Sequence, residues 1–210
     1  GSDTVYGGLN NDLIYGGDQN DRAWGDDGLD TLFGGNGHDT LFGGNGNDTV
    51  YGEEGDDSVD AGQNSDHVFG GNGNDALFGN HGADYLEGGN GGDILRGGEG
   101  ADYLVGYAPG AETADGGNVF EAGDNNDTLL GGGGFDTMFG ELGNDLVYGG
   151  QGNDQINGNG GEDMIYGGNG ADVARGGDAG DWIFAGNPYG ADDSLFGASD
   201  TLYGDRGDDF

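Results

Sequence analysis

The sequence predicts an all-β fold in which short parallel strands stack as the coils of a right-handed parallel β-roll. Three observations lead to this prediction. Glycine accounts for 56 of the 210 residues, an aspartate recurs every nine residues along most of the chain, and an apolar residue follows each recurring aspartate two positions later. A helical alternative fails because glycine costs roughly 1 kcal/mol per helical site relative to alanine.

The recurring aspartate sets the pitch of the predicted coils. The first run starts at Asp3 and continues without interruption to Asp102, and a second run extends from Asp127 to Asp181. Asn118 stands nine residues before the second run, in the aspartate slot. Two units would make one coil of 18 residues, so successive units should alternate between two parallel sheets that share an interior.

Two stretches disturb the repeat, although we expect residues 1–210 to form a single roll domain. An insertion near 107–117 lengthens one turn, and the spacing is irregular near 185–199. Asp200 and Asp209 are again nine residues apart, which indicates that the roll resumes after the second disturbance.

Each repeat unit combines a strand signal with a turn signal. The residue two positions after each repeat aspartate is apolar, for example Leu41, Leu77 and Met138, whereas its neighbours vary and include Arg22 and Asp60. One apolar residue between tolerant ones indicates a three-residue strand whose middle side chain points inward. The other six residues are rich in glycine, which suits turns that need positive φ.

The charge of the chain calls for a cation. Four basic residues stand against 41 acidic ones, for a net charge of −37. Aspartates of the same sheet edge would lie about 5 Å apart in adjacent coils, where two like charges cost roughly 3 kcal/mol per pair at an effective dielectric constant near 20. A divalent cation between two such aspartates would turn this repulsion into a net attraction. The same charge excludes nucleic acid as a partner.

Calcium suits these turns better than other metals. Ca²⁺ takes about six to eight oxygen ligands in flexible geometry, whereas Mg²⁺ demands a rigid octahedron. Zinc lacks its usual ligands, because the chain has no cysteine and its three histidines lie at variable repeat positions.

The turns resemble those of the RTX (repeats-in-toxin) family. The sequences Gly-Gly-Asn-Gly-Asn-Asp at 43–48 and at 70–75 match its nonapeptide, Gly-Gly-x-Gly-x-Asp-x-apolar-x, and the resemblance covers almost the whole chain. It implies that Ca²⁺ binds between the turns of successive coils, through aspartate side chains and backbone carbonyls. If nearly every turn holds an ion, about twenty Ca²⁺ ions would almost cancel the chain's charge.

This resemblance implies a set of metal-ligating aspartates. They are Asp12, Asp21, Asp30, Asp39, Asp48, Asp57, Asp66, Asp75, Asp84, Asp93, Asp102, Asp127, Asp136, Asp145, Asp154, Asp163, Asp172, Asp181, Asp200 and Asp209. Irregular turns should bind more weakly. The turn before Asp66 has Ala61 and Asn64 in place of glycine, and Asn118 lacks a carboxylate.

The resemblance also implies a setting. RTX proteins are typically bacterial, leave the cell unfolded by type I secretion and fold in extracellular calcium, so we expect this chain to be secreted or at the cell surface. Three roles stay open: a secretion and folding module of a larger toxin, protease, lipase or adhesin; a structural protein of a filament, matrix or surface layer; and a polysaccharide- or ice-binding accessory domain.

Neither catalysis nor a membrane span is expected. The sequence contains no Gly-x-Ser-x-Gly motif and no Cys/His pair, and we expect no enzymatic activity. No apolar run approaches the roughly 18 residues that span a membrane.

The residue three positions after the aspartate should point outward, and in alternate units it is apolar or aromatic. This row contains Glu87 as its only charge, and Tyr203 should join it if the register survives. Its first members are Tyr15, Phe33, Tyr51 and Phe69. The rings could simply cover the sheet as cross-strand neighbours. Alternatively, this face packs against a second copy, a neighbouring domain or a filament subunit, and the coil ends permit end-to-end stacking.

Overall fold

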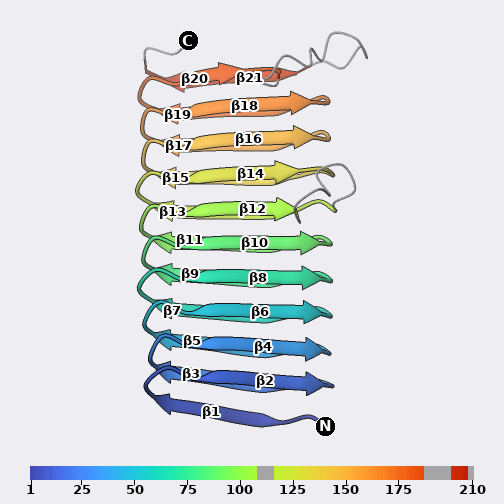
Figure 1. Cartoon of the computed structure of the whole chain (residues 1–210). Coiled ribbons are helices and arrows are strands. Elements are labelled where there is room, and N and C mark those ends of the chain that lie inside the picture. Colours follow the sequence, from blue (N-terminus) through green and yellow to red (C-terminus); the bar gives the residue numbers. More distant parts are fainter. Residues whose placement is uncertain (108–115, 187–199, 208–210) are drawn as a thin grey trace.

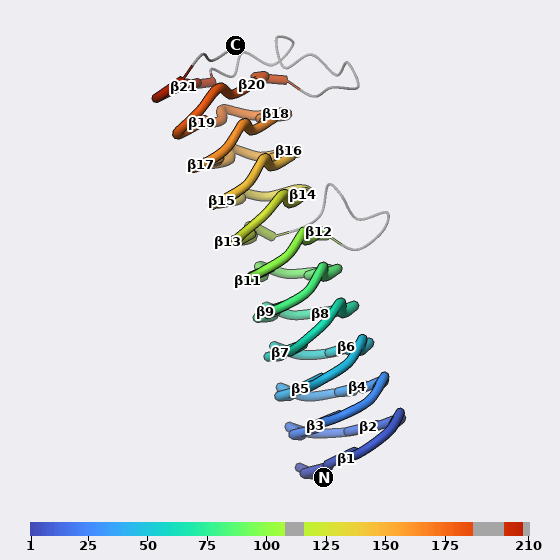
Figure 2. The backbone as a smooth tube through the Cα atoms, turned by 90° about the vertical axis from the view of Figure 1, so that its left-hand side faces the viewer, coloured from blue at the N-terminus to red at the C-terminus, as the bar shows by residue number. Residues whose placement is uncertain are grey.

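The computed structural model describes residues 1–107, 116–186 and 200–207, and the regular elements of these residues are all β-strands. Successive strands run in opposite directions along the two sides of a flattened coil, and the coils stack in one column (Figures 1 and 2). Odd-numbered strands form one parallel sheet and even-numbered strands form the other. The predicted parallel β-roll is therefore confirmed.

The strands have these bounds. The odd-numbered sheet contains β1 (Thr4–Leu9), β3 (Arg22–Asp27), β5 (Thr40–Asn45), β7 (Ser58–Gln63), β9 (Ala76–His81), β11 (Ile94–Glu99), β13 (Val119–Asp124), β15 (Thr137–Leu142), β17 (Gln155–Gly160), β19 (Val173–Asp178) and β21 (Thr201–Arg206). The even-numbered sheet contains β2 (Leu13–Asp18), β4 (Thr31–Asn36), β6 (Thr49–Glu54), β8 (His67–Asn72), β10 (Tyr85–Asn90), β12 (Tyr103–Tyr107), β14 (Thr128–Gly132), β16 (Leu146–Gln151), β18 (Met164–Asn169) and β20 (Trp182–Phe184).

The register repeats every 18 residues, as between Asp21 and Asp39. At the insertion the offset between Asp102 and Asp127 grows to 25 residues, yet the same pairing continues. The expected insertion near 107–117 and irregular turn near 185–199 lie largely outside the described residues, so their internal structure stays a prediction.

The strands are longer than expected. Most contain six residues, not three, because the glycines that follow the outward residue still pair with the next coil. In β4 the second glycine, Gly35, has φ of 109°, a conformation that glycine adopts without strain. The chain therefore bends round the edge of the roll while its peptide groups remain in the ladder, and the connecting turn is shorter than predicted.

The placement of Tyr203 was wrong. It lies in β21, which pairs with β19 in the odd-numbered sheet, and Arg175 lies over its ring at 4.2 Å. The step from Asp172 to Asp200 covers 28 residues, yet the sheets keep alternating from β19 through β20 to β21, so Asp200 precedes a strand of the odd-numbered sheet.

A single file of apolar side chains fills the roll. The inward residues alternate between the two sheets, and Leu32, Leu41 and Leu77 are all fully buried. Because most strands contribute one such side chain, the core is thin. The repeat aspartates of the turns make up the buried polar residues beside it. Within the described part of the chain, no helix has the length and apolar character needed to cross a bilayer.

Candidate metal sites in the turns

The repeat aspartates lie immediately before the strands, where each turn enters a sheet. From Asp21 to Asp181 they are at most 3% exposed, although aspartate is rarely buried in proteins unless it is paired. Asp12 and Asp200 are partly buried, and Asp209 lies outside the described residues. The structure therefore brings the predicted site residues together as two internal rows of carboxylates.

Hydrogen bonds between coils orient these carboxylates. The backbone N–H of Asp21 donates to Oδ1 of Asp39 at 2.7 Å, and that of Asp57 donates to Oδ1 of Asp75 at 2.8 Å. The pattern continues past the insertion, where the N–H of Asp102 donates to Oδ1 of Asp127 at 2.7 Å. One oxygen of each carboxylate is therefore used in holding adjacent coils in register.

The second carboxylate oxygen is buried and has no hydrogen-bond donor. This holds for Oδ2 of Asp12, Asp21, Asp30, Asp39, Asp48, Asp57, Asp66, Asp75, Asp84, Asp102, Asp127, Asp145, Asp154 and Asp163. A buried carboxylate oxygen without a donor is strongly unfavourable. A whole row of such oxygens indicates that a positively charged group belongs beside them.

At most of these sites a backbone carbonyl approaches the same place as the Oδ2 atom. A Cβ atom added to Gly7 would lie 2.7 Å from Oδ2 of Asp12 and 2.8 Å from the carbonyl oxygen of Gly25 in the next coil. Side chains larger than glycine would fill this space. Two hydrogen-bond acceptors cannot satisfy each other, so a cation that contacts both oxygens would stabilise their approach.

Asn118 shows what a donor does in the same position. It is 1% exposed, and its Oδ1 accepts from the N–H of Asp93 at 2.8 Å, as an aspartate would. Its Nδ2 donates to the carbonyl of Gly131 at 3.4 Å. The amide thus supplies the donor that the carboxylates lack. Weak or absent calcium binding at Asn118 stays a prediction, and this contact gives it a physical reason.

Burial raises the pKa of the ladder carboxylates. The pKa of Asp57 rises to about 7 and that of Asp66 to about 8, mainly because burial disfavours the charged form and secondly because carboxylates in adjacent coils repel it. Backbone hydrogen bonds offset part of this rise. Without a cation, the folded ladder would therefore bind protons near neutral pH. The sequence indicated the repulsion between coils but not the larger contribution of burial.

Asparagine accommodates the irregular turn before Asp66. Asn64 adopts φ of 76°, in the left-handed region that asparagine tolerates better than most residues. Asp66 is 1% exposed, and its Oδ1 accepts from the N–H of Asp48 at 2.8 Å. In burial and in this hydrogen bond Asp66 therefore matches Asp75, although Ala61 stands where Gly70 begins the complete turn before Asp75.

Side chains alone do not form a metal cluster in these turns. In the ranges described, no three His, Cys, Asp or Glu side chains gather at one point. A cation at Oδ2 would take most ligands from backbone carbonyls and water, together with one or two carboxylates. This all-oxygen, flexible ligand set fits Ca²⁺.

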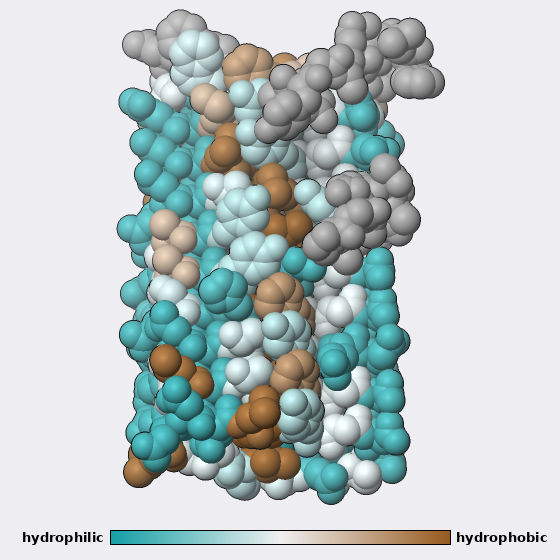
Figure 3. All heavy atoms as spheres, viewed as in Figure 1, coloured by the Kyte–Doolittle hydropathy of each residue, from teal (hydrophilic) through white to brown (hydrophobic). Residues whose placement is uncertain are grey.

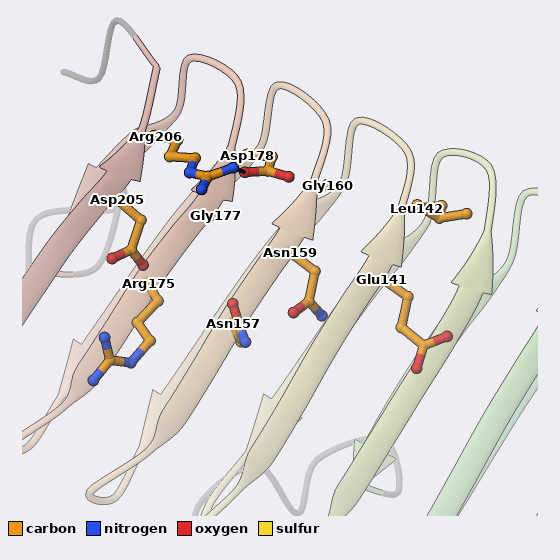
Figure 4. A pocket seen from close by; sticks show the side chains of 10 residues that line it. All are labelled: Glu141, Leu142, Asn157, Asn159, Gly160, Arg175, Gly177, Asp178, Asp205 and Arg206. Carbon is orange, nitrogen blue, oxygen red and sulfur yellow. Dashed lines mark ion pairs between the residues drawn. The ribbon is translucent and has the colours of Figure 1, made fainter.

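A shallow hollow on the odd-numbered sheet is a second place where polar groups gather (Figure 4). Arg206 Nη1 lies 3.8 Å from Asp178 Oδ1, and Glu141, Asp205 and Arg175 also line the hollow. These charged side chains are exposed, with both signs interspersed. The hollow therefore has the character of an ordinary solvated sheet surface.

Comparison with known families agrees with this geometry. A family model described as the RTX calcium-binding nonapeptide repeat matches residues 1–32, 24–59, 33–68, 60–95, 87–108, 112–147, 121–156, 139–174, 157–187 and 190–210. A search of curated proteins found no match. The matched segments cover nearly the entire chain, and the chain belongs to the family of RTX calcium-binding repeats.

Proposed function

We propose that this chain is a calcium-dependent folding module of a larger secreted protein. The observation that supports the proposal most directly is the row of buried Oδ2 atoms named above, which lack a donor and most of which lie close to a backbone carbonyl of the next coil. The ligands in this proposal are the repeat aspartates from Asp12 to Asp209 named above. Bound Ca²⁺ would supply the positive charge that these paired oxygens need.

The chain's own groups prepare each site. The N–H of one coil orients the carboxylate above it through Oδ1, which leaves Oδ2 directed at the carbonyl. Glycine leaves the space between them open. Because each carboxylate is positioned by the coil below, the sites should form cooperatively along the stack, as expected when each repeat contacts only its neighbours.

Several features support an extracellular setting for this module. Extracellular calcium modules work at roughly 10⁻⁴–10⁻³ M Ca²⁺, and a chain with net charge −37 would remain unfolded where calcium is scarce. RTX repeats typically occur in secreted proteins. We therefore propose export in the unfolded state, by type I secretion from a bacterium, followed by folding outside the cell or at its surface.

A structural role is the second candidate. The described residues contain no element outside the roll, and repeat matches extend over nearly the whole chain. Such continuity also suits a filament, matrix or surface-layer protein, in which the aromatic face or the coil ends would contact another copy. In both roles the chain binds calcium and performs no catalysis.

Circular dichroism of the stripped chain tests the proposed folding. With calcium removed, the chain should be disordered at pH 7.5, and millimolar Ca²⁺ should produce a β-type spectrum cooperatively. Mg²⁺ at the same concentration should have a much smaller effect. A β-type spectrum in excess chelator at this pH would contradict the proposal.

A further inference from the structure

Outward-facing rings stack along the even-numbered sheet. Tyr15, Phe33, Tyr51 and Phe69 form a ladder with centroid separations of 4.8 to 4.9 Å and interplanar angles of 6 to 9°. Figure 3 shows apolar and aromatic side chains gathered in a column along this face of the roll. Parallel rings at this separation overlap, so each ring covers part of its neighbour's face. A ring face becomes fully accessible only where a stack ends.

One stack ends in the middle of the roll, at β14. Tyr103 of β12 stacks on Tyr85 at 5.6 Å and 7°, but its register partner on the other side is Thr128 of β14. Rings resume in β16, where Tyr148 stacks on Tyr166 at 4.9 Å, but the register partner of Tyr148 in β14 is Leu130, two residues beyond Thr128, so the two stacks lie side by side and not in line. Strand β14 thus lacks a ring, and the flanking strands are two strand spacings apart, roughly 9.5 Å.

A cavity of about 600 Å³ occupies this interruption. Its size falls within the range of roughly 300–1,000 Å³ that is usual for small-molecule sites. Leu130 and glycine backbone of β14 form its floor, and tyrosines border it. The side chains used below are Tyr103, Thr128, Gln151 and Asn169. Tyr103 is 40% exposed, so one ring is available to a ligand.

The lining of the cavity contrasts with the rest of the surface. Charged residues make up 21% of the chain, yet none occurs among the described residues that line this cavity. An anionic ligand would be repelled by the chain's overall charge. A purely apolar ligand would leave Thr128, Gln151 and Asn169 without partners. The combination favours a neutral ligand with both an apolar face and hydroxyl groups.

We propose that this cavity, the β14 pocket, binds a neutral saccharide. A pyranose ring presents a face of C–H groups that suits the electron-rich face of Tyr103. Its hydroxyls can both donate to and accept from the hydroxyl of Thr128, and further sugar units along the strands can do the same with the amides of Gln151 and Asn169, five residues beyond the register partners of Tyr103. The site lies on the outer surface of the even-numbered sheet and reaches, through Gln151 and Asn169, the turns that precede Asp154 and Asp172.

Titration calorimetry of the calcium-loaded full chain tests this proposal. Cellohexaose and maltohexaose serve as neutral probes, and a galacturonate hexamer serves as the anionic counterpart. At least one neutral probe should bind saturably, and the anionic probe should bind at least tenfold more weakly. Tyr103→Ala should weaken binding of the neutral probe at least tenfold. The matched control is Tyr51→Ala, which removes a ring from inside a stack and should leave binding unchanged.

A second variant covers the case in which Tyr103→Ala fails to fold. Thr128→Tyr adds a ring beside Tyr103, which should extend the stack, fill the pocket and abolish saccharide binding. Calcium-induced circular dichroism verifies that each variant folds. The proposal is overturned if neither neutral probe binds at 10 mM, if the galacturonate binds as tightly, or if Thr128→Tyr folds and retains full affinity. Because folding is measured separately, failure here would leave calcium-dependent folding intact.

Discussion

Acid should substitute for calcium in folding this chain. Burial and neighbouring carboxylates raise the pKa of Asp57, Asp75 and Asp163 to about 7, and those of Asp66 and Asp127 to about 8, from 3.8 in each case. The folded, metal-free chain therefore holds more protons than the unfolded chain. Its stability should be fully present below pH 3.8 and lost as the pH rises through these raised values.

The size of this effect decides whether it can be seen. Since one pKa unit corresponds to about 1.4 kcal/mol, lowering the pH from 8 to 5 stabilises the fold by a few kcal/mol per carboxylate, on the order of 3 kcal/mol. The five carboxylates together contribute on the order of 10 kcal/mol. This is comparable with the entire folding free energy of a typical domain, about 5–15 kcal/mol. Protonation of the ladder can therefore move the metal-free chain from unfolded to folded.

The assay is far-ultraviolet circular dichroism of calcium-stripped chain in calcium-free buffer. Samples should be dilute and kept above pH 5, since the calculated isoelectric point is about 4.1. The β-type signal should grow as the pH falls from 8 to 5, and calcium should bind more weakly over the same range because protons compete for Oδ2. A stripped chain that stays disordered at pH 5, or gains structure as the pH rises, would refute the reasoning.

Three substitutions probe individual sites. Asn118→Asp replaces an amide donor with a carboxylate, so calcium counting by equilibrium dialysis should find one more bound ion per chain; an unchanged count would contradict the cation assignment. Asp66→Ala and Asp75→Ala should shift the calcium midpoint by amounts that agree within about twofold, because the two residues share burial and hydrogen bonding; a shift confined to Asp75→Ala would show that the irregular turn binds weakly. Gly46→Ala forces a side chain into φ of 134° and against the carbonyl oxygen of Gly28 and should raise the calcium midpoint at least tenfold, whereas Gly186→Ala, with no described atom within 4 Å of the added methyl group, should leave the midpoint unchanged.

Periodicity predicted the architecture because every level of the fold repeats with it. The nine-residue spacing predicted the length of each coil. The apolar residue two positions after each aspartate, such as Leu77, predicted the core. Strand length was wrong because periodicity shows where a unit recurs, not how many of its peptide groups pair. The irregular segment before Asp200 also concealed which sheet the following strand joins, so the sequence placed Tyr203 in the wrong one.

The site was predicted in its residues but not in its chemistry. Sequence alone could not show that one oxygen of each aspartate holds the coils together while the other lacks a donor. The amide contact of Asn118 depends on the same three-dimensional placement. Likewise, Leu130 counted as one more apolar residue in the outward row, because sequence spacing does not reveal that a missing ring opens a cavity.

The two sheets carry different rows of outward side chains, so odd-numbered and even-numbered repeats are not interchangeable. In the even-numbered sheet the row contains rings and aliphatic groups with Glu87 as its only charge, whereas in the odd-numbered sheet Asp60, Arg96 and Glu121 interrupt it. Gain or loss of one nonapeptide would preserve the calcium turns but transpose the two faces along the rest of the chain. Only changes by pairs of repeats keep each face continuous. The insertion after β12 keeps the alternation of the sheets, since β13 still joins the odd-numbered sheet. A partner that recognises one face would therefore tolerate the gain or loss of two repeats but not of one.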